Sequence, residues 1–160
     1  MSQSLIEKDV SQIRKVLQEL LVKSEAEGCV VCDSGGYVLA QEGRGAGDSL
    51  VVSALGAGVF AASRELARIL GENEFSAVFH QGERKSIFIR AVNPEVLLVV
   101  IFSNAGSIGL VRLYAAPAAV EMHRILDEAR GRTGSEKSPH QFVLTDGASL
   151  FMGKGAPAGS

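Results

Sequence analysis

The side chains best suited to chemistry are two cysteines, Cys29 and Cys32, which have the C-x-x-C spacing of redox and metal sites. They lie inside an apolar run that is typical of a β-strand, where alternation would place them on opposite faces. A redox pair of this kind normally opens a helix after a strand, and this pair does not. We therefore expect two buried free thiols, which fits a reducing compartment.

The other reactive residue types are not grouped along the chain. His80, His123 and His140 are scattered, and no two of them have the spacing of a local metal site. The sequence has neither a G-x-S-x-G nucleophile elbow nor a G-x-x-x-x-G-K-[ST] phosphate loop. Residues 43–47 superficially resemble a dinucleotide-binding loop but lack its third glycine, so we interpret them as a flexible loop. We predict no catalytic residue, no metal site and no cofactor, and an enzyme is the least expected class.

The bulk composition is that of an ordinary globular protein. The chain has 160 residues, 46% of them hydrophobic and 21% charged, and a formal net charge of −2. This balance predicts no general attraction to nucleic acid or anionic lipid. No secretory signal is recognisable, and the longest apolar run, residues 96–102, is far shorter than the ~20 residues needed to span a bilayer. We expect a soluble, cytoplasmic protein without membrane partners.

The hydrophobic periodicity predicts an α+β fold with the element order α-β-β-α-β-β-β-α. Apolar residues at three- and four-residue steps from Ile6 to Leu21 predict a first helix, which Ser4 and Glu7 could cap and Gly28 could end. Asp33 precedes Ser-Gly-Gly in a hairpin turn, where we expect it to accept backbone hydrogen bonds. Alternating or continuous apolar runs predict five strands that form one antiparallel sheet, at residues 29–33, 37–41, 75–81, 85–92 and 96–103. Two further helices are predicted at residues 48–70 and 107–129.

Two features complicate the C-terminal third. Pro117 lies inside the last helical pattern and should kink or divide that helix, because proline lacks an N–H and clashes with the preceding turn. We assign residues 1–130 to one domain and residues 131–160, rich in glycine and serine, to a flexible tail. Two apolar islands in the tail, residues 142–144 and 150–152, are candidate docking segments.

The middle helix, residues 48–70, carries two apolar stripes. One consists of larger residues and is predicted to face the core: Val51, Leu55, Val59, Ala62, Leu66 and Ile69. The other consists of small residues, Ala54, Ala57, Gly58 and Ala61, and continues into Arg64, Glu65 and Arg68. Glycine inside a helix costs roughly 1 kcal/mol relative to alanine, so Gly56 and Gly58 need an offsetting gain. Close approach of a second protein would supply it; packing of the small residues on the chain's own sheet is the alternative.

The order of elements and several local sequences resemble the Roadblock/LC7 family over residues 5–129. The segments that carry the resemblance are the hairpin at residues 28–40, the small-residue helix with Ser53-Ala54-Leu55 and residues 61–66, and the apolar strand that leads into Gly109-Leu110-Val111-Arg112. Within the family, length and tail are most similar to the bacterial MglB-like regulators. The resemblance implies a non-enzymatic domain without an active site of its own.

The resemblance also implies partners. MglB-like members are homodimers that pair their middle helices, join their sheets edge to edge and bind a Ras-like small GTPase of the MglA type near its switch regions. They stimulate GTP hydrolysis without supplying an arginine finger. The implied dimer and GTPase contacts are Ala54, Ala57, Gly58, Ala61, Arg64 and Arg68. Arg44 and the apolar islands, at Phe142, Leu144 and Phe151, are candidates for further partner contacts. The alternatives are a solvent-exposed loop charge at Arg44 and apolar islands that cover the chain's own sheet.

Two other functions remain open at this stage. The first is a non-catalytic dimeric scaffold that tethers a signalling or motor complex. The second is a small-molecule sensor, because five-stranded sheets with flanking helices also occur in ligand-binding domains, which need an apolar pocket with convergent polar groups.

Overall fold

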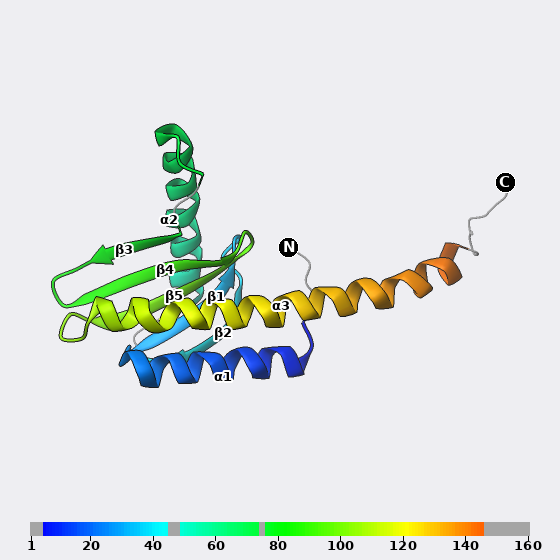
Figure 1. Cartoon of the computed structure of the whole chain (residues 1–160), viewed down its shortest axis with the longest axis horizontal. Helices are drawn as coiled ribbons and strands as arrows, with labels where there is room; N and C mark the ends of the chain where they lie inside the picture. Colours follow the sequence, from blue (N-terminus) through cyan, green and yellow to red (C-terminus); the bar gives the residue numbers. More distant parts are fainter. Residues whose placement is uncertain (1–4, 45–48, 74–75, 146–160) are drawn as a thin grey trace. The chain divides into compact units, whose positions relative to one another are not determined.

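The computed structural model describes residues 5–44, 49–73 and 76–145 (Figure 1). Side chains are described as far as Arg132. It confirms the predicted α+β fold and its element order. The elements are α1 (Glu7–Ser24), β1 (Gly28–Asp33), β2 (Val38–Gly43), α2 (Ser49–Leu70), β3 (Ala77–Gln81), β4 (Lys85–Asn93), β5 (Val96–Ser103) and α3 (Ile108–Thr145).

The five strands form one antiparallel sheet in the order β2-β1-β5-β4-β3. Strand β5 lies in the middle, with Val99 paired to Val30 of β1 on one side and to Ile89 of β4 on the other. Residues 96–102 of β5 are all buried, as expected of a central strand that is covered on both faces. The outermost strands are β2 and β3, each of which pairs with a single neighbour among the described residues.

The ends of α1 differ from the prediction at the C-terminal side. At the start, the Asp9 carboxylate accepts a hydrogen bond from the backbone N–H of Ile6 (3.0 Å), whereas Ser4 lies outside the described residues. The helix ends at Ser24, and Glu25 adopts a left-handed conformation (φ 60°) while its N–H donates to the carbonyl of Leu21. Gly28 is therefore not the stop signal. It opens β1, where a Cβ would come within 1.9 Å of the Arg44 carbonyl oxygen.

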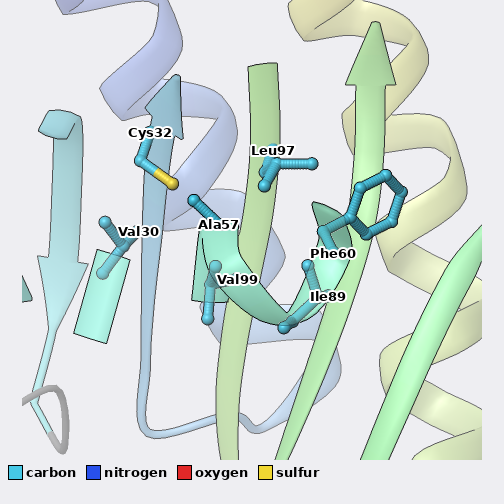
Figure 2. Close-up of a cluster of buried hydrophobic side chains, with 7 residues drawn as sticks. All are labelled: Val30, Cys32, Ala57, Phe60, Ile89, Leu97 and Val99. Carbon is cyan, nitrogen blue, oxygen red and sulfur yellow. The ribbon is translucent and has the colours of Figure 1, made fainter. Parts of the chain in front are cut away.

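The core on one face of the sheet is formed with α2. Ala57 and Phe60 of α2 pack against Val30 and Cys32 of β1, Ile89 of β4, and Leu97 and Val99 of β5 (Figure 2). On the other face, Cys29 points toward α1, with its Sγ 3.9 Å from the Leu17 carbonyl oxygen. The two cysteines thus lie on opposite faces, buried and free, as predicted.

Helix α3 is longer than expected and is not divided at Pro117. Pro117 is exposed, so the carbonyl that loses its helical hydrogen-bond donor can be solvated by water. The helix also continues beyond residue 129 to Thr145, so residues 131–145 are helical instead of the flexible tail we expected. Once a helix is nucleated, each added residue gains a hydrogen bond, which offsets a penalty of roughly 1 kcal/mol at a glycine such as Gly131.

By contact density the chain divides within α3. Residues Leu5–Ile125, which include the whole sheet, α1, α2 and the first part of α3, form one compact unit. Residues from Leu126 onward belong to a second unit, of which the helical part runs to Thr145. The candidate site described below lies entirely in the first unit.

Candidate functional site

In the described part of the chain, no three or more His, Cys, Asp or Glu side chains come together as a group that could hold a metal ion. Burial, and secondarily the charge of Glu42, raises the pKa of the Cys29 thiol to about 12. Burial raises the pKa of the Cys32 thiol to about 11. Both thiols are therefore protonated at neutral pH, which makes them poor nucleophiles and poor metal ligands.

Asp33 has the structural role that its turn sequence predicts. Its Oδ1 accepts hydrogen bonds from the backbone N–H groups of Gly35 (2.9 Å) and Tyr37 (3.0 Å). These bonds hold the β1–β2 turn, in which Gly36 has φ +90°. A side chain at Gly36 would approach the Ala54 Cα to 2.8 Å, so the turn lies directly against α2. Asp33 thus helps to position α2 through the turn.

The exposed face of α2 is the most unusual surface in the described residues. Leu55, Leu66 and Ile69 are 67%, 51% and 68% exposed in the protomer. Leu50, Val51 and Leu70 are exposed as well, although leucine, valine and isoleucine usually lie inside. The residues of α2 that are buried against the sheet are instead Ser53, Gly56, Ala57, Phe60 and Ala67.

The predicted assignment of the two stripes of α2 was therefore wrong. In the stripe that we assigned to the core, only Val59 packs against it, half-buried, while Val51, Leu55, Ala62, Leu66 and Ile69 face outward. The physical reason is that small residues at 53, 56 and 57 let the helix lie close to the sheet, where Phe60 supplies the bulk. A three- and four-residue periodicity identifies both faces but cannot show which one meets the chain's own sheet.

The predicted contact residues consequently separate into two groups. Ala54, Gly58 and Ala61 are exposed, as an intermolecular contact requires. Ala57 is only 7% exposed and belongs to the core cluster, so it is not available to a partner. This part of the prediction is corrected because Ala57 lies on the sheet-facing side of the same helix.

The charged residues at the end of this stripe are held by their own chain. The Arg64 guanidinium donates a hydrogen bond to the Pro94 carbonyl oxygen (2.6 Å) and lies 5.2 Å from the centre of the Phe60 ring. Arg68 is exposed and pairs with Glu65, with its Nε 3.0 Å from Oε1. Arg64 thus ties α2 to the β4–β5 turn, and Arg68 remains at the surface.

The additional predicted contacts are placed only in part. Arg44 is exposed, and its backbone N–H donates to the Glu27 carbonyl oxygen (2.7 Å) next to the undescribed residues 45–48. Phe142 and Leu144 fall within α3, beyond the last described side chain, and Phe151 lies outside the described residues. Their contact role stays a prediction.

We call the exposed side of α2 the outer face; its residues are Val51, Ala54, Leu55, Gly58, Ala61, Ala62, Leu66 and Ile69. Its centre is small-sided, and nothing lies within 4 Å of the position that a Cβ on Gly58 would take. Larger aliphatic residues stand toward both ends. The arrangement offers a shallow apolar surface on which another helix can approach closely. Sequence reasoning found the small centre but missed Leu55, Leu66 and Ile69, which it had placed in the core.

By length and composition alone, α2 is also apolar enough to cross a membrane. Its place in the fold argues against that reading. The helix connects β2 to β3, which belong to the same sheet, and one side of it packs on that sheet. The exposed apolar residues on its other side are a candidate interaction surface.

The described hollows do not resemble an enclosed ligand pocket. One open groove of about 740 Å³ lies between α1 and α3 and is lined largely by polar and charged side chains, among them Lys15, Glu19, Lys23 and Arg124. A sensor domain would need an apolar pocket that buries most of its ligand. The outer face of α2 is therefore the better candidate site.

Comparison with known proteins identifies the domain. The Roadblock/LC7 domain model matches residues 12–102, more than half of the chain. Three solved structures are similar over most of their length. Myxococcus xanthus MglB is 33% identical, with 79% of this chain and 96% of that chain covered and a TM-score of 0.73. The gliding protein MglB from Thermus thermophilus is 30% identical, with 79% and 97% covered and a TM-score of 0.75. An MglB described as having a tetrameric arrangement is 30% identical, with 80% and 97% covered and a TM-score of 0.76.

Proposed function

The chain belongs to the Roadblock/LC7 domain family and is similar to MglB proteins, and on that premise we propose that it is a homodimeric regulator of a Ras-like small GTPase of the MglA type. It stimulates GTP hydrolysis by binding near the switch regions. The observation that carries this proposal is the outer face of α2, where large aliphatic side chains are exposed in the protomer. Burying one such side chain fully is worth roughly 1.5–3 kcal/mol, so a partner surface is strongly favoured.

The small centre of the outer face supports the homodimer. Two copies of α2 can approach closely where Ala54, Gly58 and Ala61 offer no bulk. The outer edge of β3 is unpaired in the described part of the protomer, so a second sheet could pair with it. Both features agree with a two-fold contact in which the same surface of each copy meets its equivalent.

The large residues of the outer face support a second partner. Leu55, Ala62 and Leu66 are displaced around the helix from Ala54, Gly58 and Ala61, so a contact centred on the small residues leaves part of them uncovered. Two copies would place these residues side by side as an apolar platform for the GTPase. Arg64 is engaged with Pro94 and Phe60, and Arg68 with Glu65. The proposed mechanism therefore repositions the catalytic groups of the GTPase without an arginine finger from α2.

The decisive experiment combines the purified protein with an MglA-type GTPase and follows single-turnover GTP hydrolysis. We expect the protein to accelerate hydrolysis and the variant Leu66→Asp to lose both binding and acceleration, since a carboxylate would be desolvated in the contact. Binding without acceleration would support the scaffold function in place of GTPase activation. If several MglA-type GTPases neither bind nor respond, the proposed partner class is wrong.

A further inference from the structure

A second exposed surface lies in the groove between α1 and the first part of α3, away from the outer face of α2. Val22 of α1 is 80% exposed and lines this groove, and Val120 on the solvent side of α3 is 68% exposed. Val16 and Ile125 also line the groove, whereas Lys23 reaches over the Tyr114 ring at 6.0 Å. Helix α2 packs on the Cys32 face of the sheet and α1 on the Cys29 face. A protein bound to α2 therefore leaves this groove accessible.

The charges beside the groove indicate what kind of surface fits it. Lys15 and Glu19 are exposed, stand one helical turn apart on α1 and both line the groove. Neither makes an ion pair within the described residues. A partner of a single charge sign would meet one of the two favourably and the other unfavourably. A surface that carries a carboxylate opposite Lys15 and an ammonium group opposite Glu19 would pair favourably with both side chains.

We infer that this groove is a second self-association surface, and that its occupant is the α1–α3 face of another copy of this chain. In a two-fold contact, residue i of one copy meets residue j of the other, and residue j of the first copy meets residue i of the second. An antiparallel pair of α1 helices would then place Lys15 opposite the Glu19 of the second copy, twice over. The same contact would cover Val22 and Val120, which solvent surrounds in the protomer.

This contact has a consequence for assembly if the proposed α2 dimer also forms. Each chain would then carry two separate two-fold contacts. Depending on the angle between the two axes, such contacts close into a tetramer or extend into a filament. The inference does not require the α2 contact, because a chain without it would still pair through α1 and α3.

Charge reversal tests the inference on the full chain by sedimentation velocity. At concentrations up to about 1 mM, we expect wild-type protein to form species larger than a dimer where the proposed α2 dimer also forms, and concentration-dependent dimers where it does not. Lys15→Glu and Glu19→Lys should each weaken this assembly roughly tenfold or more, because like charges would face each other twice. Mixing the two variants should restore it, because both acidic side chains of the first variant then face the two lysines of the second. Lys8→Glu, on α1 but outside the groove lining, is the matched control and should behave as wild type.

A second variant separates this inference from the proposed function. Ile69→Asp should abolish the α2 contact but leave concentration-dependent dimers that Lys15→Glu then disrupts. Lys15→Glu alone should leave an α2 dimer and its GTPase stimulation unchanged. The inference is overturned if Ile69→Asp protein stays monomeric at all these concentrations, or if mixing the two charge variants restores nothing.

Discussion

Gly56 and Gly58 stand two residues apart on α2 and face opposite environments. A Cβ on Gly56 would lie 3.5 Å from Val99 Cγ2 on the sheet, whereas a Cβ on Gly58 would have nothing within 4 Å. Gly56 is therefore explained by packing inside the protomer, and Gly58 is not. A helix-interior glycine lowers stability by roughly 1 kcal/mol, so the open position of Gly58 supports the α2 contact proposed above.

Enlarging Gly58 should separate folding from association. We expect Gly58→Met to raise the stability of the isolated protomer by about 1 kcal/mol through helix propensity, and to weaken dimerisation at least tenfold by filling the small centre. Urea unfolding and light scattering measure the two effects. The matched control is Gly131→Met on α3, since Gly131 also has open space around its Cβ position and should leave dimerisation unchanged. Equal dimer affinities in the two variants would remove Gly58 from the interface.

A charge on the outer face should abolish partner binding without unfolding the domain. Ile69 is exposed in the protomer, so Ile69→Asp should change the free energy of unfolding by no more than about 0.5 kcal/mol at low concentration. Binding to the GTPase should be lost, because the carboxylate would be buried without a partner. Leu113→Asp on α3 introduces the same charge at a similarly exposed position and should bind normally. Titration calorimetry compares the two, and unchanged affinity in Ile69→Asp would exclude its contact.

Arginine at positions 57 and 61 should have opposite consequences although the two alanines are one turn apart. Ala57 lies in the core cluster, so Ala57→Arg should destabilise the protomer by roughly 3 kcal/mol or more, since the charge is buried among apolar side chains. Ala61 is exposed, so Ala61→Arg should fold normally and fail to dimerise. Circular dichroism during urea titration distinguishes them. A well-folded Ala57→Arg variant would contradict the packing described above.

The buried thiols should make the protein less stable at alkaline pH. Burial raises the pKa of Cys29 from 9.0 to about 12 and that of Cys32 to about 11 in the folded state. Above pH 9 the unfolded chain therefore loses thiol protons that the folded chain retains, and the free energy of unfolding falls as pH rises toward the folded pKa values. Urea titrations between pH 8 and pH 11 should show a shallower fall in a Cys29→Ala/Cys32→Ala variant. Identical slopes would exclude a thiol contribution.

Much of the fold was predictable because its signals are local. The hairpin turn at Asp33 to Gly36, the end of α2 at Gly71, which has φ +80°, and the continuous apolar strand β5 each follow from residues close in sequence. The predictions that failed concern residues whose conformation depends on segments distant in sequence. Gly28 resembled a helix stop but is needed where β1 passes the Arg44 carbonyl, and Pro117 lies on the solvent side of α3, where it does not divide the helix.

The sequence by itself determined that α2 has two apolar sides, that one of them is small-sided, and that the thiols lie on opposite faces of a strand. Only the tertiary structure decided which side of α2 meets the sheet. Both sides have helical periodicity and apolar residues, so hydrophobicity alone cannot rank them. The choice depends on how closely the helix axis can approach the sheet, which small residues at 53, 56 and 57 permit and leucine at 55 or 66 would prevent. The large side chains were thereby left outside, where a partner can bury them.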